Sequence, residues 1–123
     1  MYREGSQDNE NGNPMTIPRN DPLRFKWALA AAQQNHIGGQ AYAAECYEKG
    51  LGVERDYASA FEWFMKAAER EDDYAQYSIG LFFEHGTGCD IDLGQALFWY
   101  RKAATQGDQY AIVAVGRLAG LVA

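Results

Sequence analysis

Three residue types that bind zinc occur close together in the second half of the chain: His85, Cys89 and Asp90. A structural zinc site normally has four ligands arranged in pairs, and no second pair accompanies these three. The segment "CDIDLG" at 89–94 has acidic residues in common with a calcium loop but lacks the central glycine and the distal glutamate of that motif. The sequence therefore predicts no metal site and no cofactor, and it makes Asp92 a helix cap instead.

Two Gly-x-Gly segments, at 50–52 and 86–88, are candidates for phosphate-binding loops. A dinucleotide fingerprint needs a third glycine between a strand and a helix, and a P-loop ends in Gly-Lys-Ser/Thr; neither pattern is present. Each segment is predicted to stop a helix and bend the chain. No nucleophile, base and metal set can be assembled from the sequence, so an enzyme is the weakest of the functional hypotheses.

Composition and charge narrow the classes of partner. The chain has 123 residues, is 47% hydrophobic and carries a net charge of −6, which fits one domain with an apolar core. Nucleic acids and anionic membranes attract basic surfaces, so neither is an expected partner. The polar N-terminus lacks the pattern of a secretion signal, and Cys46 and Cys89 form no Cys-x-x-Cys pair. We expect a cytoplasmic protein.

The sequence contains an internal repeat, and the elements of that repeat must position any functional site. Trp27, Trp63 and Trp99 are spaced by 36 residues, and the same step relates alanine pairs, both Gly-x-Gly segments and several aspartates. Residues 39–74 and 75–110, aligned without a gap, are identical at 12 of 36 positions, which indicates a structural repeat. The three tryptophans are expected in the core.

Each repeat has the pattern of two helices. Apolar residues recur at helical spacing, the first glycine of each Gly-x-Gly ends one helix, and Asp56 or Asp92 caps the next. We predict an all-α domain at 21–123 with two complete repeats, at 39–74 and 75–110, and partial units at 21–38 and 111–123. The six predicted helices are 22–35, 39–49, 56–70, 75–85, 92–106 and 109–121. Residues 1–20 are polar and are predicted to form a disordered tail.

These motifs resemble the Sel-one-like repeat family, whose α/α repeats are related to tetratricopeptide repeats. The second copy of the pattern is carried by Ala75, Ile79, Gly80, Phe83, Gly86, Gly88, Asp92, Ala96, Trp99, Ala103, Ala104 and Gly107. The first copy departs from it at Ala44 and Glu71, where the family pattern has glycine. The resemblance implies a right-handed α/α solenoid that binds other proteins. Secreted members of the family often join the two helices of a repeat by a cysteine pair, and neither repeat has one here.

The resemblance also implies where a partner binds, because the variable positions of each first helix line the concave face in this family. Tyrosine is enriched in binding hot spots, which favours an aromatic and acidic groove for a basic or mixed protein segment over a merely solvated face. The candidate partner-binding residues are Glu45, Glu48, Tyr74, Tyr77, Leu81, Glu84, His85, Tyr110, Val113 and Arg117.

The last predicted helix is apolar on more sides than one neighbouring helix pair can cover. Such a face is either an interface or an aggregation hazard. The sequence therefore predicts self-association or partner docking through Ile112, Val115, Leu118 and Leu121.

Two functional hypotheses follow for a binding protein. The first is a non-catalytic protein–protein interaction module, a bacterial cytoplasmic adaptor or scaffold that holds a partner in its concave face. The alternative is an immunity or antitoxin protein that neutralises a basic toxic effector by direct binding, which would use the chain's acidity.

Overall fold

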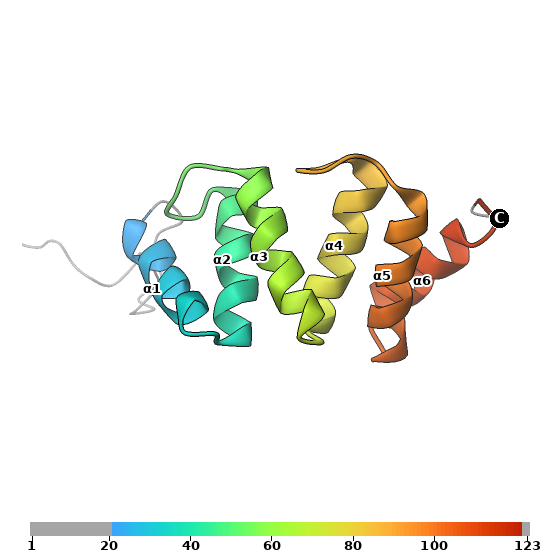
Figure 1. Ribbon diagram of the computed structural model, residues 1–123, viewed down its shortest axis with the longest axis horizontal. Helices are drawn as coiled ribbons and strands as arrows, with labels where there is room; N and C mark the ends of the chain where they lie inside the picture. The colour runs from blue at the N-terminus through green and yellow to red at the C-terminus, as the bar shows by residue number, and fades with distance from the viewer. Residues whose placement is uncertain (1–20, 122–123) are drawn as a thin grey trace, which may run out of the picture.

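Within residues 21–121, which the computed structural model describes, the chain forms six α-helices and no strand. They stand in a row in chain order, and each packs mainly on the next (Figure 1). The predicted all-α solenoid is confirmed, with bounds that differ from the predicted ones only at the helix ends. The predicted tail at 1–20 lies outside the described residues. The helices are α1 (Pro22–Gln33), α2 (Ile37–Lys49), α3 (Tyr57–Glu69), α4 (Asp73–His85), α5 (Leu93–Thr105) and α6 (Gln109–Leu118).

Side chains placed just before each helix fix where the helix begins. As predicted, Asp92 caps α5, its Oδ1 accepting from the backbone N of Gln95 at 3.0 Å, and Asp56 does the same for α3. His36 also caps a helix: its Nδ1 accepts a hydrogen bond from the backbone N of Gly39 at 3.0 Å. This bond starts α2 two residues earlier than the sequence pattern predicts, because an imidazole nitrogen can replace the usual cap oxygen.

The Gly-x-Gly segments bend the chain as predicted and also join neighbouring repeats. Gly86 ends α4 in the left-handed region at φ 71°. Gly88, at φ 70°, lies so close to the preceding repeat that a Cβ there would be 2.5 Å from the carbonyl oxygen of Tyr57. Gly52 approaches the carbonyl of Asp21 at the start of α1 in the same way. The second glycine therefore allows the long loop of one repeat to contact the start of a helix in the repeat before it.

Alanine and aromatic side chains fill the spaces between helices. The central part of the core surrounds Phe64, Ile79 and Phe82, each at most 2% exposed. Trp99 is buried as predicted and Trp63 is half-buried. The prediction is wrong for Trp27, which is 61% exposed.

The difference between the tryptophans follows from their neighbours. Trp63 packs against clusters that include residues of α2 and of α4, one on each side of its own helix. Among the described elements, α1 packs mainly on α2 alone, so the indole of Trp27 has apolar neighbours on fewer sides.

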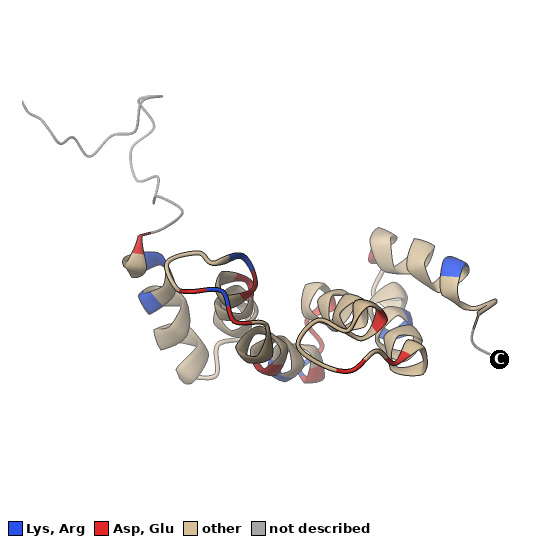
Figure 2. Ribbon diagram, turned by 90° about the horizontal axis from the view of Figure 1, so that it is seen from above, with Lys and Arg blue, Asp and Glu red and all other residues tan. Residues whose placement is uncertain are grey.

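Alternate helices lie along opposite sides of the row (Figure 2). The first helices of successive units, α2, α4 and α6, share one side, and the second helices, α1, α3 and α5, share the other. Side chains that contact one another between α4 and α6, described below, make the first side continuous. We call it the α2–α4–α6 face.

Candidate functional site

The candidate binding residues lie on the α2–α4–α6 face in two groups. The group nearer the C-terminus is built around Tyr77 on α4. Its ring centroid is 5.6 Å from that of Tyr100 on α5 and 5.9 Å from that of Tyr110 on α6. Tyr110 is 75% exposed, whereas Tyr77 and its neighbour Leu81 are half-buried. Tyr77 is therefore part of the packing between helices, and Tyr110 is the ring offered to solvent.

In this group, the carboxylate of Glu84 makes hydrogen bonds to other side chains of the same protein. Its Oε1 accepts a hydrogen bond from the hydroxyl of Tyr100 at 2.7 Å, and both of its oxygens accept from the guanidinium of Arg117, one of them at 3.1 Å. These donors favour the charged carboxylate, and the Arg117 hydrogen bond is the largest cause holding its pKa at about 2. The imidazole of His85 lies 4.0 Å away and is exposed. Glu84 thus ties α4, α5 and α6 together.

The second group comes from α2 and from the first turn of α4. Glu45 pairs with the ammonium of Lys49 at 3.0 Å, one helical turn further along α2. Tyr74 on α4 is 40% exposed. Burial raises the pKa of its phenol, and so do the charges of Glu45 and Glu48, while Lys49 lowers it. The phenol therefore lies within electrostatic range of all three charged side chains of α2.

Glu48 is half-buried, and within residues 21–121 its carboxylate has neither a hydrogen bond nor an ion pair. Burial is the largest cause that raises its pKa, ahead of Lys49, which lowers it, and Glu45, which raises it. A carboxylate that loses water without gaining a donor favours its neutral form. Glu48 is therefore a polar group with unused hydrogen-bonding capacity.

The predicted docking end on α6 is exposed in part. Ile112 is 44% exposed, Val113 69% and Leu121 67%. Val115 is half-buried, and Leu118 is 1% exposed because it packs against the buried side of α5. Leu118 therefore belongs to the core and cannot take part in docking without unfolding the end of α6.

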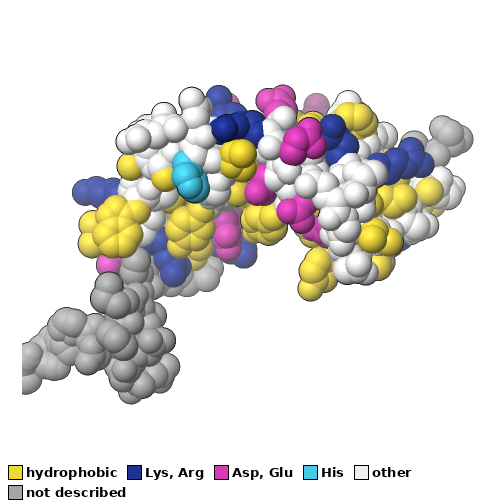
Figure 3. All heavy atoms as spheres, turned by 90° about the horizontal axis from the view of Figure 1, so that it is seen from below, with side chains coloured by type: hydrophobic (Ala, Val, Ile, Leu, Met, Phe, Trp, Pro, Cys, Tyr) yellow, Lys and Arg dark blue, Asp and Glu magenta, His cyan; other side chains and the backbone are white. Residues whose placement is uncertain are grey.

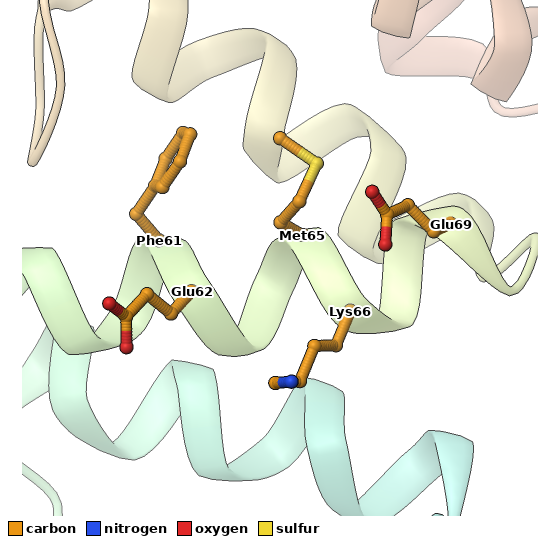
Figure 4. A pocket seen from close by; sticks show the side chains of 5 residues that line it. All are labelled: Phe61, Glu62, Met65, Lys66 and Glu69. Carbon is orange, nitrogen blue, oxygen red and sulfur yellow. The ribbon is translucent and has the colours of Figure 1, made fainter.

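The described residues also show what chemistry the chain offers elsewhere. No group of three or more His, Cys, Asp or Glu side chains in this part of the chain is placed to hold a metal ion. A cavity of about 480 Å³ opens on α3 (Figure 4). Phe61, Met65 and Glu69 line it on one side of α3, and Glu62 and Lys66 line it next to them. Among these lining residues, the groups that can act as a base or a nucleophile are the carboxylates of Glu62 and Glu69 and the amine of Lys66.

Comparison with known proteins identifies the repeat. The family model described as Sel1 repeat matches residues 2–36, 38–72 and 73–108. The chain belongs to the Sel1 repeat family. The second and third matches coincide closely with the two complete repeats of the sequence prediction. The first includes α1 and extends into residues that the structure does not describe, so the domain limits proposed from the sequence stay a prediction.

Solved structures give the same fold. A Sel1 repeat protein from Oxalobacter formigenes is 33% identical with a TM-score of 0.76 over 81% of this chain and 41% of its own. The protein c5321, titled a protective antigen present in uropathogenic Escherichia coli strains, is 32% identical with a TM-score of 0.79 over 89% of this chain and 23% of its own. The chain thus corresponds to less than half of each.

A third structure supports the fold alone. The cysteine-rich protein B of Helicobacter pylori is 24% identical with a TM-score of 0.69, and the match covers 73% of this chain and 68% of that one. A search of the curated proteins found no match. Sel1 repeats are generally protein–protein interaction modules.

Two residues of the site were missed in the sequence. Tyr100 was not singled out, although the equivalent residue one repeat earlier is Phe64 and the added hydroxyl was a visible difference. Lys49 was also missed, although Glu45 precedes it by four residues, a spacing that predicts an ion pair on a helix. The contact of Glu84 with Arg117 spans 33 residues and could not be read from local spacing.

Proposed function

We propose that this Sel1 repeat chain is a non-catalytic adaptor that binds a partner protein on its α2–α4–α6 face. The observation that carries the proposal is the set of exposed aromatic and apolar side chains on that face. Tyr74, Tyr110 and Val113 are 40%, 75% and 69% exposed, and they lie beside charged groups held in place by the fold. Rigid aromatic anchors surrounded by polar groups are typical of binding hot spots.

Charge favours a basic or mixed partner segment. The chain carries a net charge of −6, and the face includes Glu45 and Glu48. Acidic side chains also gather over the middle of the row when it is viewed toward the short turns between helices, with hydrophobic side chains on both sides (Figure 3). Complementary charge speeds encounter and suppresses wrong partners more than it adds affinity.

The proposal is tested by capture of partners from an extract of the source cells, followed by affinity measurement with the purified partner. The face variant Tyr74→Ala/Tyr110→Ala truncates two exposed rings on the face. The control variant Trp27→Ala/Phe98→Ala truncates two rings that are 61% and 51% exposed on α1 and α5. We expect about a tenfold or greater loss of affinity for the face variant only.

An immunity or antitoxin role is the second candidate function, and the acidity of the chain is the observation that favours it. A basic toxic effector would then be bound tightly and in fixed stoichiometry, whereas an adaptor would bring several partners at lower affinity. Capture of one stoichiometric basic protein whose toxicity the chain abolishes decides for immunity.

We also propose that apolar residues of α6 and of the turn after it form a second contact, either with another copy of the chain or with a partner. Ile112 and Leu121 are 44% and 67% exposed and Val115 is half-buried. Sedimentation equilibrium of the wild type and of Ile112→Ser at increasing concentration tests self-association. A monomeric mass throughout contradicts it.

A cytoplasmic location completes the proposal. Cys46 and Cys89 are both free, and burial raises the pKa of Cys46 to about 11, so its thiol is protonated and unreactive at neutral pH. In the described part of the chain, no helix has the length and apolar character needed to cross a bilayer. Fractionation of the source cells tests this location.

A further inference from the structure

We propose that Glu48 binds an arginine side chain of the partner protein, in the way that Glu84 binds Arg117 within the chain. This inference rests on the proposed function and names the chemistry that the α2–α4–α6 face recognises. Two observations carry it: the chain contains a complete example of such a pair one repeat later, and the earlier copy has the carboxylate without its donors.

The pair at Glu84 serves as the template. Its carboxylate receives the guanidinium of Arg117 through two nitrogens, Nη1 bonding Oε2 and Nη2 bonding Oε1. The hydroxyl of Tyr100 donates to the same Oε1 at 2.7 Å. A planar guanidinium matches a carboxylate in this two-bond arrangement, and an ammonium does not. The carboxylate side chain is only 10% exposed when so paired.

Glu48 occupies the equivalent place one repeat earlier. The helices α2 and α4 both have 13 residues, and each ends at a left-handed glycine with nearly the same backbone angles, φ 71° and ψ 45° at Gly50 against φ 71° and ψ 39° at Gly86. Glu48 and Glu84 both stand two residues before that glycine. Their side chains therefore leave equivalent helices at the same point.

The donors that complete the pair are replaced in the earlier repeat. Leu81 stands where the later repeat has Arg117, and Phe64 stands where it has Tyr100. Neither side chain can donate a hydrogen bond. The result is a half-buried carboxylate with no hydrogen bond or ion pair to the residues that the structure describes.

The surroundings of Glu48 suit a guanidinium from outside. Tyr74 is 40% exposed nearby and offers an aromatic ring, on which arginine stacks well. The residue equivalent to Tyr74 in the next unit is Tyr110, whose ring lies against that of Tyr77. The residue equivalent to Tyr77 in the earlier repeat is Ala41 on α2, which has no ring. The earlier repeat therefore has less side-chain volume at the position where the later repeat places a second ring.

Lys49, the residue after Glu48, already pairs with another carboxylate. The ammonium of Lys49 bonds the carboxylate of Glu45 at 3.0 Å. Lys49 lowers the pKa of Glu48, but burial raises that pKa by more. The described residues thus compensate the charge of Glu48 only in part, and a positive group from a partner has a favourable place to bind.

The test compares two capped pentapeptides, one with a central arginine between alanines and one with the uncharged isostere citrulline, added to the full chain and followed by NMR chemical shifts. We expect the arginine peptide to bind about fivefold or more tightly than the citrulline peptide, with shifts centred on Glu48 and Tyr74. In Glu48→Gln the preference disappears. In Leu81→Arg, which supplies a guanidinium from the chain itself, arginine peptide binding weakens.

Equal binding of the two peptides, a preference that persists in Glu48→Gln, or no binding of either peptide up to about 10 mM would overturn the inference. Thermal melting of each variant shows that it is folded. A different result tests the proposed function separately from the arginine inference. If the purified partner binds Glu48→Gln as well as wild type but loses affinity for the Tyr74→Ala/Tyr110→Ala variant, the arginine inference fails and the binding face stands.

Discussion

Glu48 and Glu84 show how one position of a repeat serves two purposes. Both side chains project from equivalent helices, yet Glu84 accepts hydrogen bonds from Tyr100 and Arg117, and Glu48 accepts none from the described residues. The pKa of Glu84 is lowered and the pKa of Glu48 is raised for these reasons. The Glu84 carboxylate is paired within the fold, and the Glu48 carboxylate has no hydrogen-bond donor among the described residues.

The first prediction concerns Glu84. Because its folded pKa of about 2 lies below its ordinary value of 4.5, its contribution to stability is complete above about pH 4.5 and is lost as the pH falls toward 2. Glu84→Gln should lower the free energy of unfolding by about 1–3 kcal/mol at pH 7. Urea unfolding at several pH values should show this difference vanishing near pH 2. A difference that is constant with pH would contradict the account.

The substitution Glu48→Gln should change the free energy of unfolding in the opposite direction to Glu84→Gln. Since the folded pKa of Glu48 is raised, its ionised form costs stability at neutral pH, and the cost disappears as the pH falls below about 4. We expect Glu48→Gln to be as stable as wild type or up to about 1 kcal/mol more stable at pH 7. Urea unfolding beside Glu84→Gln is the matched comparison, and a clear loss of stability would show that Glu48 has a structural partner.

Glu71 holds a backbone conformation that glycine adopts more easily. Its φ is 72°, and the equivalent residue one repeat later is Gly107 at φ 92°. Glu71→Gly should raise the free energy of unfolding by about 0.5–1 kcal/mol, because glycine adopts this backbone conformation without strain. The loss of the weak side-chain contacts of Glu71 with Gln76 and Lys102 reduces this gain. Gly107→Ala is the reverse control, since an added Cβ would meet nothing within 4 Å and only the backbone cost remains. Thermal melting of both variants should show opposite shifts.

Among the elements, the bend between α4 and α5 requires a glycine at position 88. Gly88→Ala should destabilise the fold by about 2 kcal/mol or more, because it places a Cβ against the carbonyl of Tyr57 and in a left-handed conformation. Gly116→Ala on α6 is the control. That glycine is helical with open space around it, so alanine there should stabilise by about 0.5–1 kcal/mol. Chemical denaturation that finds equal effects would contradict the role of the bend.

The repeat period explains why the fold could be predicted at the level of the elements. Periodic tryptophans, glycines and cap aspartates mark helix ends directly, and the six helices follow from them. The role of Gly52 and Gly88 as contacts between repeats could not be predicted, because it depends on backbone atoms of a preceding repeat. The exposure of Trp27 was missed for a related reason: periodicity gives each tryptophan the same surroundings, while the number of neighbouring helices differs.

The site was predictable only in outline. The candidate residues, which the family resemblance assigns to the concave face, belong to α2, α4 and α6, and their role in binding stays a prediction. Pattern alone could not separate the residues that the fold itself uses, such as Tyr77 and Glu84, from those left exposed, such as Tyr110 and Val113. That distinction depends on contacts between different helices, which side-chain spacing within one helix does not report.

For the molecule as a whole, we propose that a partner protein binds on the α2–α4–α6 face. The acidic charge of the chain, the exposed rings on this face and the carboxylate of Glu48, which no residue of 21–121 pairs with, all favour a partner segment with basic side chains. The α1–α3–α5 side also exposes aromatic rings, Trp27 and Phe98, which provide a matched comparison.

The most direct measurement is the dissociation constant of the purified partner for wild type, for Tyr74→Ala/Tyr110→Ala and for Trp27→Ala/Phe98→Ala, all shown to be folded. The account predicts a loss of affinity of about tenfold or more for the Tyr74 and Tyr110 variant and a change of less than about twofold for the Trp27 and Phe98 variant. Equal affinities for all three proteins, or a loss confined to the Trp27 and Phe98 variant, would contradict it.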